Sequence, residues 1–250
     1  IKSFHLLSEH GNFIYLESSL IHLSRIMYDE KDYSLSNKYY QLLDTIASSN
    51  SLKREAVIRL MYGFEIENSE IAVSYSQRVL ELQKVDDRLI ARAKIIIVRS
   101  DFENGNFARA SSLCNEIVKL TTNTDGTEAM YKIAYLTYLE EDYEKTEELI
   151  FEMADKYSSD HFIAMGFVLL ADIYLKQENN YQAKATLESI IENHDGEDVI
   201  NIAREKWENI VESEKLEKVE VQKKEVTIEI GDEDFDYEIN YSDLQIEEEF

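Results

Sequence analysis

Apolar residues along this chain recur at three- and four-residue spacing, in successive runs separated by short polar connections. One run, "FVLLADIY", places Phe167, Leu170 and Tyr174 on one side of a helix, and the next run does the same with Leu187 and Ile191. This spacing is typical of helices with one buried face. The connections "SSNS", "TTNTDG", "SSDH" and "NHDG" end the runs. The pattern therefore predicts a series of amphipathic helices.

An aromatic residue marks a turn between two predicted helices at four places in the chain. Tyr33 follows Lys-Asp, Phe107 follows Gly-Asn, Tyr143 follows Glu-Asp and Tyr181 follows Asn-Asn. The last three lie 36 and 38 residues apart, and the 74 residues from Tyr33 to Phe107 leave room for one unmarked copy. A period in this range is the signature of a helical repeat array. We therefore expect a series of helix-turn-helix units, the second of which lacks the aromatic marker.

These units resemble the tetratricopeptide repeat (TPR) family, whose pattern is W-x2-L-G-x2-Y…A-x3-F…P over 34 residues. The stretch from Phe167 to Tyr174, with Ala183 and Leu187 after it, follows this pattern with Phe in place of the first Trp and no closing Pro. The resemblance implies an all-α fold, a right-handed α-α superhelix of the TPR solenoid type. We expect the chain to end in a short acidic C-terminal tail that is β-like or disordered.

The repeat pattern divides the chain into four expected parts. Residues 1-16 read as the end of a preceding repeat, so we expect the array to continue upstream in a longer protein. Residues 17-198 hold about five TPR-like units. Residues 199-219 form an amphipathic helix that caps the stack, with Trp207 as its main anchor. Residues 220-250 form the acidic tail.

Composition narrows the choice of partners more than the choice of fold. The absence of Pro and the presence of only seven Gly favour helices. A net charge of −25 argues against nucleic acid or an anionic membrane as a partner, and no apolar run approaches the roughly 20 residues that span a bilayer. One cysteine, Cys114, excludes an internal disulfide framework.

The sequence carries no pattern typical of a catalytic, cofactor or metal site. Its five histidines form no HExxH and no i,i+4 pair, and there is no glycine-rich phosphate loop and no nucleophile elbow. Adjacent carboxylates such as Asp86 and Asp87 point about 100° apart on a helix, so they make a poor acid/base pair. Cys114 aligns with a buried apolar position of the repeat. We therefore expect a protein that is not an enzyme and that takes no cofactor, metal or small-molecule ligand.

The most informative polar residues lie on the first helix of each unit, which in TPR arrays lines the concave groove. Equivalent positions carry Arg25, Arg59 and Arg99, and Arg92 shares the face of Arg99. Arg and Tyr are typical of binding hot spots. The predicted groove residues are Arg25, Arg59, Arg92, Arg99, Tyr62, Phe102, Tyr131, Tyr135 and Tyr138. If they bind a partner, replacing the arginines with Gln should weaken binding without lowering thermal stability. The alternative is that the arginines pair with acids of neighbouring helices and the tyrosines fill gaps between repeats.

The tail departs from the helical pattern. Apolar residues alternate from Val226 to Ile230 and again at Phe235, Tyr237 and Ile239, on either side of a Gly-Asp turn. Alternation around such a turn is typical of a β-hairpin. The alternatives are a disordered tail that orders on a partner through these three residues, and a tail that docks into the arginine-bearing groove.

Together these features predict a non-enzymatic scaffold for protein–protein interaction, an adaptor subunit that holds a protein partner through its concave groove and acidic tail. The composition of the chain, which lacks Pro and is rich in Ile, Lys, Asn, Glu and Tyr, resembles that of the C-terminal part of long Bacteroidetes-type cell-envelope TPR proteins. That resemblance implies a periplasmic or envelope location and an outer-membrane or secretion assembly. The alternatives are a cytoplasmic adaptor, and the regulatory or targeting region of a larger enzyme.

Overall fold

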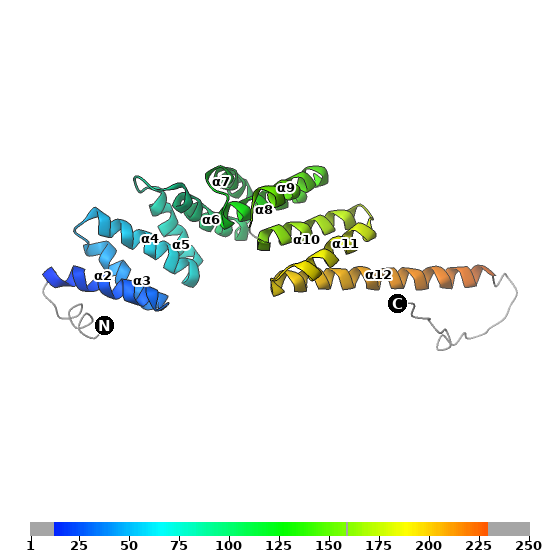
Figure 1. The fold of residues 1–250 in the computed structure, drawn as a ribbon, viewed down its shortest axis with the longest axis horizontal. Helices are drawn as coiled ribbons and strands as arrows, with labels where there is room; N and C mark the ends of the chain where they lie inside the picture. The colour runs from blue at the N-terminus through cyan, green and yellow to red at the C-terminus, as the bar shows by residue number, and fades with distance from the viewer. Residues whose placement is uncertain (1–12, 159, 230–250) are drawn as a thin grey trace.

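The computed structural model describes residues 13–158 and 160–229, and every regular element in these ranges is an α-helix (Figure 1). Within the described residues, short turns join consecutive helices into five hairpins, and a long last helix follows them. The helices are α2 (Phe13–Asp29), α3 (Tyr33–Ile46), α4 (Asn50–Glu67), α5 (Ser69–Leu80), α6 (Asp87–Glu103), α7 (Phe107–Leu120), α8 (Thr124–Leu139), α9 (Tyr143–Lys156), α10 (Asp160–Lys176), α11 (Asn180–Asn193) and α12 (Glu197–Glu229). The expected all-α solenoid is confirmed.

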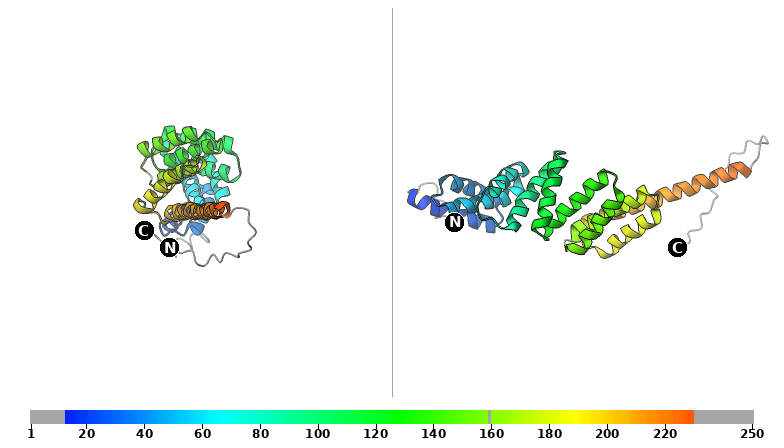
Figure 2. Two further views of the ribbon diagram at one scale, coloured as in Figure 1. Left: turned by 90° about the vertical axis from the view of Figure 1, so that its right-hand side faces the viewer. Right: turned by 90° about the horizontal axis from the view of Figure 1, so that it is seen from above.

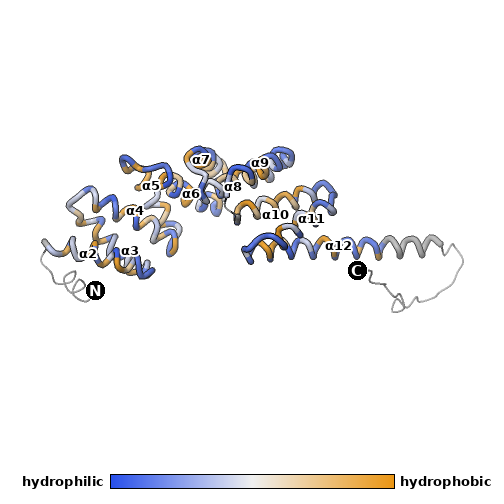
Figure 3. The backbone as a smooth tube through the Cα atoms, viewed as in Figure 1, coloured by the Kyte–Doolittle hydropathy of each residue, from blue (hydrophilic) through white to orange (hydrophobic). Residues whose placement is uncertain are grey.

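The hairpins stack along an elongated arch. Figure 1 shows α7 and α9 on the outer side of the arch, with α6 and α8 beneath them. Figure 2 shows the same stack end-on and from above, with α12 projecting beyond it. We call α2, α4, α6, α8 and α10 the first helices. The helices that follow them in each hairpin, α3, α5, α7, α9 and α11, are the second helices. Hydrophobic positions recur along the helices, and Figure 3 shows many of them on α10.

Four of the five hairpins turn with the same backbone geometry. The second residue after the helix end takes a positive φ of 57° to 73°, and the amide of the residue after it donates to a carbonyl five residues back. This is the Schellman ending of a helix. The next residue is the N-cap of the following helix, and at three of the four turns its side chain accepts a backbone amide; Asp32, for example, accepts from the amide of Leu35 at 3.1 Å. The positive-φ residues are Lys31, Gly105, Glu141 and Glu178.

The second hairpin has no such turn, which explains why its sequence lacks the aromatic marker. A single residue, Asn68, ends α4 and caps α5, with an extended φ of −157° and its side chain accepting from the amide of Ile71. The marker in the other repeats follows from the turn, because Tyr33, Phe107 and Tyr143 are each the first residue of a second helix.

Small residues bring the paired helices close together. Ala134 on α8, Ala171 on α10 and Ala183 on α11 are completely buried, at the positions where the repeat pattern requires a small side chain. Larger residues such as Ile150 and Leu187, also completely buried, fill the space around them. The core therefore continues from one hairpin to the next instead of closing within each hairpin.

The last helix is longer than the sequence predicts. Val199, Ala203 and Ile210 are buried against the stack, and Trp207 donates from Nε1 to a Glu188 oxygen at 2.8 Å. Beyond this region α12 leaves the stack, where Leu216 is 62% exposed.

The expected capping helix, 199-219, is thus part of an element that runs to Glu229, and the expected strand at 226–229 is helical. The reason is local. The alternating residues follow a stretch rich in Glu, Lys and Gln, which are good helix formers, and no Gly or Pro occurs between the start of α12 at Glu197 and residue 231. The other predicted tail residues, Phe235, Tyr237 and Ile239, and the expected upstream segment up to residue 12 lie outside the described residues.

Candidate partner-binding site

All nine predicted groove residues lie on first helices, but the structure divides them into two groups. The arginines on α2, α4 and α6 contact acids or rings of neighbouring first helices. Most of the aromatic residues, on α6 and α8, form a row that continues onto α10. The arginine side chains are occupied by contacts within the chain, whereas the aromatic rings keep part of their surface exposed.

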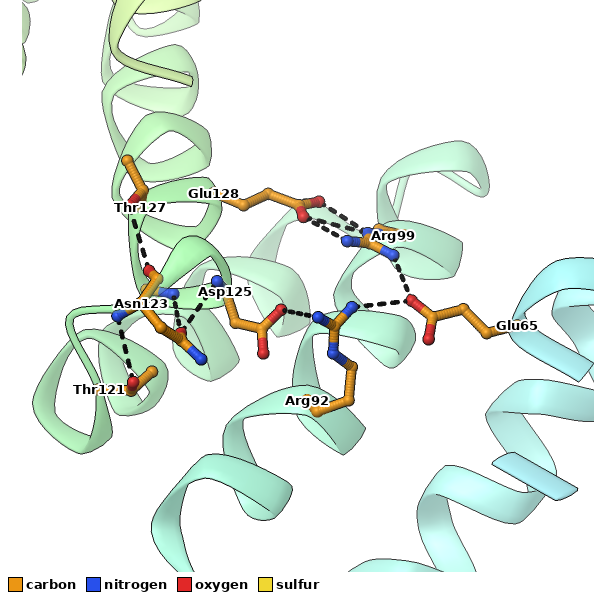
Figure 4. Close-up of polar contacts among 9 residues, drawn as sticks. Glu65, Arg92, Arg99, Thr121, Asn123, Asp125, Thr127 and Glu128 are labelled. Carbon is orange, nitrogen blue, oxygen red and sulfur yellow. Dashed lines mark hydrogen bonds and ion pairs between the residues drawn. The ribbon is translucent and has the colours of Figure 1, made fainter. Parts of the chain in front are cut away.

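The most connected arginine is Arg99, near the C-terminal end of α6 (Figure 4). Its Nε and Nη2 donate to the two carboxylate oxygens of Glu128 on α8, at 2.9 and 2.6 Å. Its Nη1 donates to Glu65 on α4 at 2.7 Å. Hydrogen bonding to Glu128 and the nearby charge of Glu65 raise the pKa of Arg99. One guanidinium group thus links three consecutive first helices.

Arg92, about two turns earlier on α6, completes this network. It donates to Glu65 at 3.0 Å and forms an ion pair with Asp125 at 3.1 Å. Asp125 is 2% exposed, and its burial raises its pKa, against the opposing effect of Arg92. Its position is fixed by Asn123, which caps α8 and accepts from the amide of Asp125 at 3.0 Å. We call the five residues Glu65, Arg92, Arg99, Asp125 and Glu128 the arginine ladder.

The other two arginines are also paired. Arg25 donates from Nε and Nη2 to Glu55 on α4, at 2.7 and 2.6 Å, and this pairing lowers the pKa of Glu55. The guanidinium carbon of Arg59 lies 4.5 Å from the ring centre of Tyr28 on α2. The contacts of Arg25, Arg92 and Arg99 with acids are those that the alternative interpretation describes, whereas Arg59 contacts a ring. A role for them in binding a partner stays a prediction.

Sequence separation narrows the choice of acids that could pair with each arginine. Arg25 and Glu55 are 30 residues apart, and Arg99 is 29 residues from Glu128 and 34 from Glu65. Each separation is close to the length of one repeat. Because equivalent positions of successive repeats lie side by side in a solenoid, an acid one repeat away from an arginine is its natural partner.

The second group forms a row of aromatic rings across three first helices. The centre of the Phe102 ring on α6 is 6.5 Å from Tyr135 on α8, and Tyr135 is 6.4 Å from Tyr131 on the same helix. Tyr131 is in turn 6.0 Å from Phe162 on α10. All four side chains are partly exposed. We call them the aromatic row; Phe162 was missed by sequence reasoning, because the polar "SSDH" before it reads as a connection and not as the start of a helix.

The aromatic row carries no charge, and a lysine connects it to the arginine ladder. Burial raises the pKa of Tyr131 to about 12, so its hydroxyl stays neutral at physiological pH. Lys132 lies 4.3 Å from the ring centre of Phe102 and 3.7 Å from Glu128, which connects the row to the ladder.

The remaining predicted aromatics lie outside the row. Tyr138 packs against Tyr143 with ring centres 5.7 Å apart, and Tyr62 on α4 lies near Arg92.

Within the described ranges, no cluster of three or more His, Cys, Asp or Glu side chains is arranged to hold a metal ion. Cys114 is completely buried, and burial raises the pKa of its thiol to about 12. No helix in the described part of the chain combines the length and apolar character needed to cross a membrane. The expectation that the protein is not an enzyme stays a prediction.

The order of the helices and the geometry of their turns define an α-solenoid of the TPR class. Comparison with solved structures agrees: the chain is similar to YrrB, described as a TPR protein with an unusual peptide-binding site, with a TM-score of 0.53 and 14% identity over 81% of this chain and 97% of that one. It also matches a TPR protein from Parabacteroides merdae (TM-score 0.46, 16% identity, 81% and 74% covered) and a thermophilic TPR protein from Thermus thermophilus (0.45, 12%, 78% and 98%).

No family model and no curated protein matches this sequence. The likeness to YrrB shows the fold, and the expected TPR resemblance is confirmed at that level. The resemblance to Bacteroidetes-type envelope proteins stays a prediction.

Proposed function

We propose that this chain is a protein–protein interaction scaffold without catalytic activity, which holds a segment of a partner protein against the aromatic row. The observation that carries the proposal is the continuity of the row, four partly exposed rings over three consecutive first helices. Tyrosine and phenylalanine supply large contact areas at a low cost in side-chain entropy, and tyrosine is enriched at binding hot spots.

The arginine ladder supports the row indirectly. It fixes α4, α6 and α8 relative to one another through Arg92 and Arg99, so the rings on α6 and α8 are held in place before a partner arrives. A surface that is ordered in advance loses less entropy on binding. In this proposal the ladder positions the binding surface, and the row makes the contacts.

The proposal can be tested with a photoreactive side chain. Benzoylphenylalanine at position 135 should cross-link a partner in the cells that produce the protein, whereas the same side chain at position 42 on α3 should not. Leu42 is a suitable control because it is 47% exposed and lies on α3, whereas the row runs from α6 to α10. A Tyr131→Ala, Tyr135→Ala double variant should reduce capture by at least about tenfold. Equal capture from positions 135 and 42, or unchanged capture by the double variant, would contradict the proposal.

We also infer that the scaffold is an adaptor subunit of a larger assembly at the cell envelope, supported by the compositional resemblance described above. Fractionation of cells with an antibody against the chain tests this inference. Recovery with the membrane or periplasmic fraction is expected. Recovery in the cytoplasm would instead favour a cytoplasmic adaptor, or the regulatory part of a larger enzyme. The contribution of the acidic tail is tested separately, by comparing partner capture with and without residues 230–250.

A further inference from the structure

A concave surface separate from the aromatic row lies among the last two hairpins, on the side of the second helices. It is a groove of about 650 Å3 between α9, α10 and α11. Its floor is apolar, with Phe151, Ile163, Phe167 and Leu170, and its α11 wall is polar, with Gln182, Thr186, Ser189 and Asn193. We call it the outer groove. The aromatic row uses a different side of α10, so the two surfaces are separate.

The outer groove results from an unusual junction between repeats. In the other hairpins the second helix packs extensively on the first helix of the next repeat, but α9 packs on α10 much less. The two helices meet closely at Gly166, where a Cβ atom would lie 2.5 Å from the terminal methyl of Met153. Away from this contact the space between α9 and α11 is left open.

The floor of the outer groove holds aromatic surface that the chain itself does not cover. Phe151 is 48% exposed, although it lies on a helix whose other face is completely buried at Ile150 and Met153. Its ring meets the ring of Phe167 edge to face, with centres 6.2 Å apart. An exposed aromatic pair in a concave site of this size is typical of a binding surface.

The charge around the outer groove selects the kind of partner. Residues 143–195 contain eleven Asp and Glu and four Lys, a net charge of −7. Among the described residues that line the groove none is Lys or Arg, whereas Asp195 is acidic. Nearby lysines are paired, Lys145 with Glu148 at 2.7 Å and Lys184 with Glu214 at 2.6 Å. The rim therefore attracts cations and repels anions.

We propose that the outer groove binds a basic amphipathic segment of a partner protein. The apolar side chains of that segment cover Phe151 and Phe167, and its Lys or Arg side chains approach the acidic rim. The same charge disfavours two other occupants. Residues 226–250 of this chain carry ten acids and no base, and an anionic membrane is likewise repelled.

The test uses the full chain and a short fluorescent peptide that forms a helix with Leu on one face and Lys on the other. A twin peptide has Glu in place of every Lys. Ala185 is exposed and lines the groove, so Ala185→Trp should block the groove without disturbing the core. Ala108→Trp is the matched control, because Ala108 is exposed on the second helix α7, away from the groove. Fluorescence anisotropy gives the dissociation constants.

We expect the Lys peptide to bind, with an affinity reduced about tenfold by Ala185→Trp and unchanged by Ala108→Trp. The Glu twin should not bind at measurable affinity. Phe151→Ser should weaken binding by a similar factor and serves as the second variant if Ala185→Trp lowers the melting temperature.

Three results would overturn the proposal. The first is an equal effect of the Trp substitutions at positions 185 and 108, which would mean that the peptide binds the acidic surface without regard to the groove. The second is equal binding of the Lys and Glu peptides. The third is loss of peptide binding in Tyr135→Ala with normal binding in Ala185→Trp, which would move the site to the aromatic row. Because Tyr135→Ala tests the row and Ala185→Trp tests the outer groove, the two proposals can fail independently.

Discussion

Replacing Arg99 with Gln should destabilise the middle of the stack, and this prediction separates a structural role of the arginine ladder from a binding role. The interpretation of the arginines as partner-binding groups predicts weaker binding without loss of thermal stability. The structure leads to the opposite expectation for Arg99. Its guanidinium group holds Glu65 and Glu128 on two other helices, and the Glu128 side chain is only 4% exposed.

The size of the effect follows from burial. Breaking a buried ion pair by removing one member costs about 3–5 kcal/mol, because the other charge is left without its partner. Arg99 itself is 37% exposed, so water screens part of this interaction, and Lys132 remains 3.7 Å from Glu128. We therefore expect a loss of about 2–3 kcal/mol in the free energy of unfolding. For a chain of this length that is a fall of roughly 5–10 °C in melting temperature.

Arg25→Gln is the matched control. Arg25 forms the same bidentate ion pair, with Glu55, but the side chains of Arg25 and Glu55 are 50% and 26% exposed. An exposed pair contributes at most about 1 kcal/mol, so this variant should melt within about 2–4 °C of the unchanged protein. Circular dichroism at increasing temperature measures both variants, and hydrogen exchange should show the loss of protection in α6 and α8. Equal small shifts for the two variants would refute the reasoning, and Arg99 would again be a candidate for partner binding.

Two further predictions concern the turns and the cysteine. Glu141 takes a φ of 62°. Glu141→Gly should therefore raise the free energy of unfolding by about 0.5–1 kcal/mol, whereas Gly105→Ala at the equivalent turn, with a φ of 73°, should lower it. Denaturant titration measures both, and shifts of the same sign would contradict the strain argument. Cys114 should not react with a thiol reagent at pH 8 until the protein unfolds, because it is completely buried and its pKa is raised to about 12. Rapid reaction of the folded protein would show that α7 opens locally.

The helices and the repeat could be predicted from the sequence because both depend on local chemistry. The three- and four-residue spacing reports the buried face of each helix, and the aromatic after Asn or Asp reports a capped second helix. The continuation of α12 to Glu229 could not be predicted in this way, because the alternation at Val226 and Ile228 indicates a strand whereas the residues before it favour a helix.

The candidate site was harder to predict, since its chemistry depends on contacts between repeats. The spacing within α6 puts Arg92 and Arg99 on one face, but it does not say whether Glu65 and Asp125 reach that face from α4 and α8. That depends on how successive hairpins are rotated, which local sequence does not specify. The outer groove depends on the same kind of information, because it lies where three helices, α9, α10 and α11, leave space between them.

The distribution of charge indicates how the two proposed surfaces would differ. Helices α4, α6 and α8 together hold eight Asp or Glu and eight Lys or Arg, so the middle of the first-helix face is balanced in a chain of net charge −25. Around the outer groove the net charge is −7. Because salt screens attraction between exposed charges, added salt should weaken peptide binding at the outer groove and leave contacts with the aromatic row almost unchanged. A basic segment would thus be recognised through charge on the outer side, whereas the row selects its partner through ring contact and shape.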